Sequence, residues 1–460
     1  MFFKLPAPAL LLTLLVSMPA LAQTGQAPPP APTLPGAQAA TPAPEPPAAV
    51  SRDARRVYES SRAKLVQIRT LLRNTNTQST VGSGFYVSDR GVIVTNFHVA
   101  SQLALDPERH RGVYVPVDGK EGEVELLAFD VQHDLAVLRV KPTEGAPADA
   151  ARAVLDFRPA SEPLSQGERI YSLGNPLDIG FAVVEGTYNG LVQRSFYPRI
   201  FFGGALNPGM SGGPALDESG RVIGVNVAKR LDGEQVSFLI PAALAQALVE
   251  RAVNAQPITK PAHAEVARQL MRHQDLLSQR FLAQPLKGQA HFGYMVPVPD
   301  DAFARCWGQG RDPDFRAFSL ERTDCQVDSH LFAGDFNTGF LRLRYEAYDA
   351  PNFHPLRFST MYSQSFRNEV FAMRGSRRKT PAECTERYID QSGLPMRAVV
   401  CMNAYRKLPG LYDVSVLVAT LNEPRKGVQG RLDAQGVSFD NGLKIVEHYL
   451  SSFRWEGSKR

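Results

Sequence analysis

The chain has 460 residues, of which 43% are hydrophobic and 21% are charged. This is an ordinary globular composition, long enough for about two or three domains that each bury a core. The net charge of +5 is spread along the chain without a long basic run or a stacking-aromatic motif, so nucleic acid is not an implied partner.

The first 50 residues are predicted to be a signal and a tether. Residues 1–22 combine Lys4, an apolar run at 10–16 and a small-x-small tripeptide ending at Ala22, which are the features of a cleaved secretory signal peptide. A signal anchor is the alternative, but the apolar run is well short of the roughly 20 residues that a spanning helix needs. Residues 23–50 are rich in Ala and Pro and are predicted to be a disordered tether.

These features predict an exported protein with no stable membrane insertion after signal cleavage. The short, Ala-rich signal is of bacterial type and favours the periplasm, with full secretion as the alternative.

Residues 51–256 are predicted to form an all-β domain. After a short helical stretch at 55–58, short apolar segments follow one another and are separated by Gly, Asp, Asn and Pro, as in a sandwich or barrel. The expected strands are 65–68, 84–87, 92–95, 113–117, 124–128, 135–140, 169–173, 190–193, 221–227 and 236–240. A helix is expected from Pro241 to about Val253.

Two further regions are expected downstream. Residues 257–288 are predicted to be a helical linker, because apolar residues recur at helical spacing over 261–282. Residues 289–460 are predicted to be an α+β domain of unknown family, with strands at 340–345, 398–402 and 412–421 and a helix at 442–452. This last domain has no motif of recognisable chemistry, and an unknown partner for it stays open.

All four cysteines lie in the last third of the chain. An even count in an exported protein favours disulfides over metal ligation. Three pairings are possible, and proximity in the sequence favours Cys306 with Cys325 and Cys384 with Cys401. No Cys-x-x-Cys or His-Glu-x-x-His occurs, so neither a metal nor another cofactor is expected.

Three short motifs in the all-β region place His98, Asp134 and Ser211 in that order. A serine hydroxyl becomes a good nucleophile only when a neighbouring base takes its proton, and histidine suits that task near neutral pH. A buried carboxylate holds the imidazole in one tautomer and stabilises its cation. We therefore expect His98 to be the base, Asp134 its partner and Ser211 the nucleophile. His98 is expected at the end of a strand. His133, next to Asp134 in the sequence, is interpreted as a surface residue.

The glycines around Ser211 predict an oxyanion hole. A tetrahedral oxyanion needs backbone N–H donors that converge on one point, and glycine lets the backbone turn sharply enough to supply them. The N–H groups of Gly209 and Ser211 are the expected pair.

Taken together, the motifs resemble those of the HtrA (Deg) branch of the trypsin-like serine proteases. The resemblance covers about residues 57–253 and rests on GSGF at 82–85, VTNFHV at 94–99, HDLAVL at 133–138 and GMSGGP at 209–214, with further matches at 173–176, 222–226 and 238–241. It implies two six-stranded β-barrels packed at right angles, with the triad in the cleft between them.

The same resemblance implies a primary specificity pocket with small, apolar walls, which would suit an aliphatic or other small uncharged side chain. Its expected residues are Ala205, Leu206, Asn226, Val227 and Ala228. The nearby loop at 229–235 begins with Lys229 and Arg230, which would attract an acidic substrate unless the loop is simply solvated.

The sequence departs from the family at two points. No PDZ-like segment is visible in 261–460, so substrate capture, chaperone activity and assembly through PDZ domains are not expected. Met210 stands where members of this branch usually have Asn and where zymogen-type trypsins have the aspartate that pairs with a newly freed amino terminus. It predicts that activation does not depend on such a terminus. Control through ordering of the loops at 203–209 and 229–235 is expected instead.

The sequence therefore predicts an exported serine endopeptidase that hydrolyses peptide bonds in protein or peptide substrates through an acyl-enzyme. The alternative is a catalytically silent binding or scaffold protein of the same fold, in which the C-terminal domain is the functional unit. The intact set of three candidate residues argues against this alternative.

Overall fold

The computed structural model describes residues 51–117, 119–142, 152–229, 235–283, 285–311, 318–327, 329–334, 336–367 and 376–457, without the side chains of 228, 229 and 311. The predicted signal and tether, residues 1–50, lie outside the described residues. Among the helices that the structure describes, none is long and apolar enough to cross a lipid bilayer.

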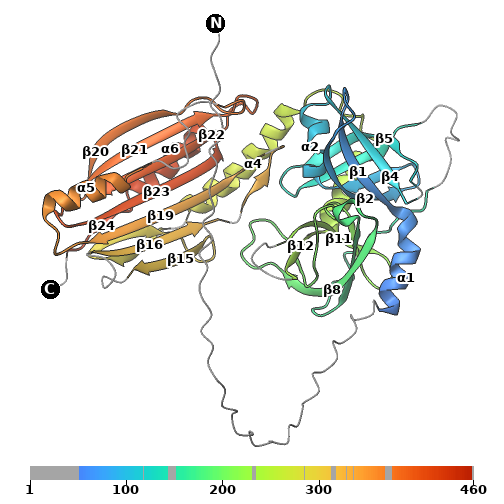
Figure 1. Cartoon of the computed structure of the whole chain (residues 1–460), viewed down its shortest axis with the longest axis horizontal. Helices are drawn as coiled ribbons and strands as arrows, with labels where there is room; N and C mark the ends of the chain where they lie inside the picture. The colour runs from blue at the N-terminus through green and yellow to red at the C-terminus, as the bar shows by residue number, and fades with distance from the viewer. Residues whose placement is uncertain are drawn as a thin grey trace, which may run out of the picture. The chain divides into compact units, whose positions relative to one another are not determined.

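The N-terminal half contains two closed, antiparallel, six-stranded barrels, which confirms the predicted architecture (Figure 1). The first barrel has the strand order β1-β2-β3-β6-β5-β4 and follows helix α1 (Arg52–Ser61) and the 3-10 turn η1 (Arg62–Lys64). Its strands are β1 (Leu65–Leu72), β2 (Gln78–Ser88), β3 (Val92–Thr95), β4 (His110–Pro116), β5 (Gly122–Asp130) and β6 (Leu135–Val140).

The second barrel has the order β10-β11-β12-β9-β8-β7. Its elements are β7 (Arg169–Gly174), the 3-10 turn η2 (Pro176–Asp178), β8 (Ala182–Leu191), β9 (Ile200–Phe202), β10 (Pro214–Leu216), β11 (Val222–Lys229) and β12 (Ser237–Pro241). Helix α3 (Ala242–Ala252) follows β12 and packs back onto β5 and β6 of the first barrel. One apolar cluster with members from both barrels fills the space between them.

The main departure from the predicted elements is helix α2 (Phe97–Leu105), since His98 was expected at the end of a strand. Strand β3 ends at Thr95, and His98 lies in the first turn of α2. The first N–H groups of a helix have no partner within it. Here the Asp134 carboxylate accepts the N–H of His98 at 2.8 Å, a long-range contact that local sequence does not reveal.

Within the two barrels the remaining differences are small. Strands β9 and β10 are only three residues long and were not predicted, and the strand expected at 190–193 is the end of β8.

Beyond α3, helix α4 (His263–Leu282) leads into a seven-stranded antiparallel sheet of order β15-β16-β19-β23-β22-β21-β20. The strands are β15 (Arg305–Arg311), β16 (Ser319–Gln326), β19 (Phe340–Asp349), β20 (Glu383–Gln391), β21 (Leu394–Ala404), β22 (Tyr412–Thr420) and β23 (Lys426–Val437). A second sheet pairs β13 (Lys287–His291), β14 (Tyr294–Val298) and β24 (Arg454–Trp455), and a small hairpin pairs β17 (Leu331–Phe332) with β18 (Asn337–Thr338).

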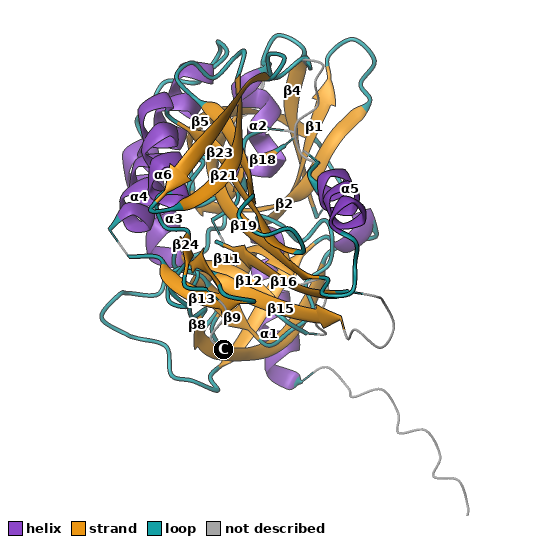
Figure 2. Ribbon diagram, turned by 90° about the vertical axis from the view of Figure 1, so that its left-hand side faces the viewer, coloured by secondary structure: helices purple, strands orange, loops and turns teal. Residues whose placement is uncertain are grey.

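Helices cover both faces of the large sheet. Side chains alternate between the two faces of a strand. In β19, Leu343 and Tyr345 join the cluster that includes α4 and α6 (Phe439–Leu450), whereas Tyr348 joins the cluster of α5 (Pro355–Ser365) on the other face. Figure 2 shows α4 and α6 side by side along the first of these faces.

Two disulfides tie neighbouring strands of this sheet together. Cys306 of β15 is bonded to Cys325 of β16, and Cys384 of β20 is bonded to Cys401 of β21. In both cases the two residues stand directly opposite each other in the strand register. This is the pairing that sequence proximity favours.

The half that contains the two barrels and the C-terminal half share one apolar core around α2. A single cluster includes Phe97 and Leu103 of α2, Leu270 of α4, and Leu331 and Leu408 from the C-terminal half. Residues after 256 therefore complete the packing around the helix that carries His98.

Candidate active site

Two hydrogen bonds join His98 to Asp134. The imidazole Nδ1 lies 2.6 Å from one carboxylate oxygen, and the backbone N–H of His98 donates to the other oxygen at 2.8 Å. The backbone carbonyl of Asp134 also accepts the N–H of Phe97 and the side-chain amide of Asn96. These contacts fix the imidazole in one orientation, with Nε2 left as the nitrogen that can accept a proton.

The charge of Asp134 raises the pKa of His98. Burial disfavours protonation of the imidazole, but the neighbouring charge of Asp134 and its hydrogen bond outweigh burial and raise the pKa of His98 above its ordinary value. The His98 side chain is 29% exposed, so a reacting group can still reach it.

A side chain of α4 supports the loop of Asp134. Gln269, which is buried, accepts the N–H of Val131 at 2.7 Å and donates to the carbonyl of Phe129 at 3.2 Å. Asp134 itself has a φ of +55°, in the left-handed region that aspartate tolerates better than most residues. The backbone on the N-terminal side of Asp134 is therefore held by a residue outside the two barrels.

The turn around Ser211 depends on glycine. Gly209 and Gly212 have φ values of +95° and +86°. A Cβ at Gly209 would collide with the carbonyl of Asn175, and one at Gly212 with the carbonyl of Ser83. Glycine is thus needed here both for the backbone conformation and for close approach.

The two predicted oxyanion donors have no internal acceptor. Within the described residues, the N–H groups of Gly209 and Ser211 make no hydrogen bond, whereas the N–H of Met210 between them donates to Asn207 at 3.1 Å. This is the arrangement that a site for an incoming oxyanion requires.

The Ser211 hydroxyl contacts the backbone of β11. Its Oγ donates to the carbonyl of Val227 at 3.4 Å, and the described residues contain no hydrogen bond between Ser211 and His98. The structure therefore joins His98 to Asp134, while the only hydrogen bond of the Ser211 hydroxyl in the described part goes to Val227.

Met210 lies in the core of the second barrel. Its side chain is fully buried in a cluster with Phe202, Leu206 and Leu239. The side chain before the nucleophile is thus held by apolar packing.

Two of the five residues expected to line a specificity pocket have buried side chains. Leu206 is buried in the core of the second barrel, and Asn226 is buried with hydrogen bonds to Ser172 and to the carbonyls of Leu173 and Met210. Both were assigned by their position along the chain, which does not reveal that their side chains point inward. Ala205 is exposed and Val227 half-buried; the side chain of Ala228 and residues 230–234 of the neighbouring loop lie outside the described part.

His133, interpreted as a surface residue, is instead paired with Asp130. Its Nδ1 lies 2.8 Å from the Asp130 carboxylate, and its ring contacts Tyr197. Burial raises the pKa of Asp130, but the hydrogen bonds and charge of His133 prevail and lower it overall. The pair therefore braces the turn that carries Asp134.

The sequence reasoning missed two contributors. Ser83 links the barrels, because its Oγ donates to the carbonyl of Gly209 and accepts the N–H of Asn175, while its N–H donates to the carbonyl of Ser211. It lies within the GSGF motif, so a local signal existed. Phe332 of β17 packs edge-on against His98, with ring centroids 5.8 Å apart, and no local signal marks it.

The described residues contain no group of three or more His, Cys, Asp or Glu side chains placed to bind a metal ion.

Comparisons with known proteins find similarity in the part of the chain that forms the two barrels. Residues 82–225 match the family model of the trypsin-like peptidase domain. The chain is 31% identical over 194 residues to "Protease Do-like 1, chloroplastic" from Arabidopsis thaliana, covering 39% of this chain and 41% of that protein. It is 32% identical over 203 residues to "Probable periplasmic serine endoprotease DegP-like" from Bartonella henselae, covering 39% of this chain and 37% of that protein.

The similarity is thus confined to about two-fifths of each of these relatives. Among solved structures, that of Deg5 is 26% identical, with a TM-score of 0.37, and covers 44% of this chain and 94% of that one.

Proposed function

We propose that this trypsin-like peptidase domain, which is similar to HtrA and Deg proteases, makes the chain a serine endopeptidase with His98, Asp134 and Ser211 as its triad. The observation that carries the proposal is the double hydrogen bond between His98 and Asp134, at 2.6 and 2.8 Å, beside a serine turn whose two flanking N–H groups have no acceptor in the described residues.

In the first half of the reaction, the Ser211 side chain rotates from Val227 toward Nε2 of His98, and His98 takes its proton as Oγ attacks the peptide carbonyl. The N–H groups of Gly209 and Ser211 bind the oxygen as it becomes negative. Asp134 stabilises the resulting imidazolium through the hydrogen bond at Nδ1. His98 then gives the proton to the leaving amine, and an acyl-enzyme on Ser211 remains.

In the second half, His98 takes a proton from a water molecule that attacks the acyl group, and returns it to Ser211 Oγ as the ester breaks. The raised pKa of His98 suits both roles, since a base of moderately high pKa accepts a proton readily and still releases it to an amine.

The test is reaction of the full chain with a fluorophosphonate probe together with cleavage of casein. The wild-type protein should label and cleave, and Ser211→Ala should do neither. Ser237→Ala is a matched control, because Ser237 is a buried serine in the same barrel whose hydroxyl accepts the N–H of Leu206. A wild type that fails to label under conditions that label other serine proteases would instead support a silent scaffold.

We also propose that the enzyme acts in the periplasm. One relative is named periplasmic, and the two disulfides of the C-terminal sheet suit an oxidising compartment. Fractionation of the cells followed by N-terminal sequencing tests this: a mature protein that begins at Gln23 in the periplasmic fraction supports it, and an uncleaved cytoplasmic chain contradicts it.

A further inference from the structure

A cavity of about 530 Å³ lies where the C-terminal half meets the helix that carries His98. Gln102, Leu105 and Asp106 line it from the side of α2, and Ala333, Phe336 and Lys407 are among the residues that line it from the C-terminal half. The two halves share an apolar core here, so the cavity is a feature of the folded chain.

Helix α2 connects the cavity to the candidate active site. His98, Gln102 and Leu105 are spaced four and then three residues apart and so lie on one face of the helix. At 1.5 Å per residue, Gln102 and Leu105 lie about 6 and 10 Å along the axis from His98. An extended peptide advances about 3.3 Å per residue, so two or three residues span this distance.

Strand β17 follows the same path. Phe332 contacts the ring of His98, and the next residue, Ala333, lines the cavity. The hairpin of β17 and β18 is anchored through Gly339, which follows β18. The carbonyl of Gly339 accepts hydrogen bonds from His273 Nε2 at 2.7 Å and from Ser329 Oγ at 2.8 Å. Adjacent residues of this hairpin region therefore contact His98 and line the cavity.

The cavity is electropositive. Three cationic side chains line it, namely Arg377, Arg378 and Lys407, against the single carboxylate of Asp106, which leaves a formal charge of 3 − 1 = +2. Burial and the charge of Lys407 lower the pKa of His263, so this histidine adds no positive charge at neutral pH.

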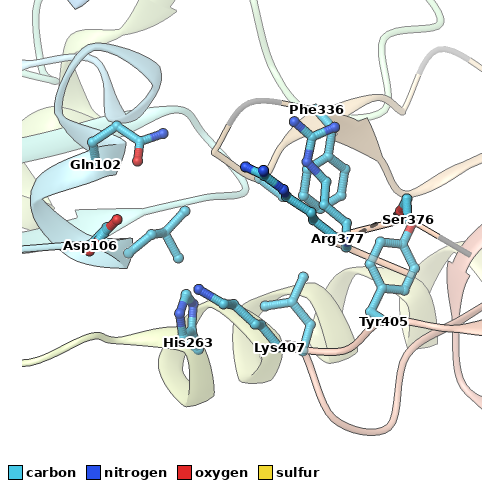
Figure 3. A pocket seen from close by; sticks show the side chains of 12 residues that line it. Gln102, Asp106, His263, Phe336, Ser376, Arg377, Tyr405 and Lys407 are labelled. Carbon is cyan, nitrogen blue, oxygen red and sulfur yellow. Dashed lines mark hydrogen bonds between the residues drawn. The ribbon is translucent and has the colours of Figure 1, made fainter. Parts of the chain in front are cut away.

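Two of these cations are available to a ligand. In the described part of the chain, no ion pair is found for Arg377 or Lys407, and both are exposed. Figure 3 shows Arg377 reaching toward Gln102 and Asp106, and the Lys407 ammonium beside His263. Next to them, Leu105, Ala333 and Phe336 offer apolar surface. This combination suits a carboxylate on a short apolar stem.

We propose that this cavity is a substrate subsite that takes a carboxylate of the peptide, two or three residues from the bond that is cleaved. The inference rests on the proposed peptidase function and adds a substrate class to it. The carboxylate has two possible sources, an acidic side chain within the peptide or the free C-terminus of a short peptide.

The test compares quenched fluorescent octapeptides that carry a single Glu at each position in turn with the matched Gln peptides, at about 50 mM salt. At one or two adjacent positions on one side of the cleaved bond, the Glu peptide should have a kcat/KM about five- to tenfold higher than its Gln partner. Two partly screened ion pairs are expected to give a preference of this size. Peptides ending in a free acid or an amide distinguish the terminal carboxylate. The ratio of kcat/KM between the Glu and Gln peptides should fall toward one at 1 M salt, where the Debye length is about 3 Å.

Charge variants of the full chain should move this ratio in opposite directions. Arg377→Gln and Lys407→Gln should each reduce it, and the double variant should bring it to about one. Asp106→Asn removes the competing carboxylate and should raise it. Lys444→Gln is the control: Lys444 is an exposed cation on α6 that does not line the cavity, and its loss should leave the ratio unchanged.

A wild-type ratio near one at every position, or a preference that survives in the double variant, would overturn the proposal. Binding of the same peptides to Ser211→Ala, followed by fluorescence anisotropy, separates the two proposals. If the wild type does not cleave but Glu peptides bind more tightly through Arg377, the peptidase function fails and the carboxylate site stands.

Discussion

Replacing Gln269 by leucine should reduce activity without touching any candidate catalytic residue. Gln269 is 6% exposed and is the partner of two backbone groups on the approach to Asp134, the N–H of Val131 at 2.7 Å and the carbonyl of Phe129 at 3.2 Å. Leucine has a similar size but cannot make either bond. Each buried group left without a partner costs about 1–3 kcal/mol, so Gln269→Leu should lower the free energy of unfolding by about 2–5 kcal/mol.

The activity should fall because Val131 lies three residues before Asp134. If the loop relaxes, the carboxylate moves relative to His98, and a displacement of about 1 Å at a catalytic group costs on the order of 100-fold in rate. We expect a 10- to 100-fold lower kcat with little change in KM, measured with a fluorogenic peptide, and a matching fall in the rate of fluorophosphonate labelling.

Gln274→Leu provides the matched control. Gln274 lies on the same helix and is fully buried, but its side chain bonds to Ser438 and Asn441 in the C-terminal half. Its replacement should lower the urea midpoint and leave kcat unchanged. If the two variants have equal kcat values at temperatures where both are folded, the proposed support of Asp134 by Gln269 is refuted.

Three other changes test the candidate site. The kcat/KM of the wild type should rise with pH with a midpoint above 6.5, because His98 must lose its proton to act as a base and its pKa is raised. Asp134→Asn removes both causes of the raised pKa, the charge and the hydrogen bond of the carboxylate. Its pH profile should have a midpoint below 6.5, and its rate should be lower by a factor on the order of 10⁴. Gly209→Ala forces a Cβ onto the Asn175 carbonyl and should reduce kcat about 100-fold or more with KM nearly unchanged; wild-type kinetics would exclude a role for this turn. Met210→Asp places an unpaired carboxylate in an apolar core and should lower the urea midpoint strongly, unlike Met210→Leu; a stable aspartate variant would contradict the packing described for this residue.

The segments that contain the candidate catalytic residues could be predicted, because their sequences are constrained by local backbone geometry and by burial. The turn around Ser211 needs Gly209 and Gly212 for its positive φ angles, and the strand that follows Asp134 has the apolar sequence of a buried strand. The strand pattern alone indicated a sandwich or barrel, and the resemblance of these motifs to the HtrA branch implied the two barrels. The disulfide pairing also followed from proximity, since strands joined by a short connection tend to be neighbours in a sheet.

Long-range contacts were decided only by the tertiary structure. His98 lies on a helix because a carboxylate 36 residues away accepts its N–H, and the predicted pocket residues Leu206 and Asn226 point inward because of their neighbours in the second barrel. Phe332 lies more than 230 residues beyond His98, and nothing in its surrounding sequence marks it. The sequence by itself thus determined which groups can do chemistry, because backbone turns and hydrophobic patterns are local. Only folding decided what surrounds them, because that depends on which distant segments share a core.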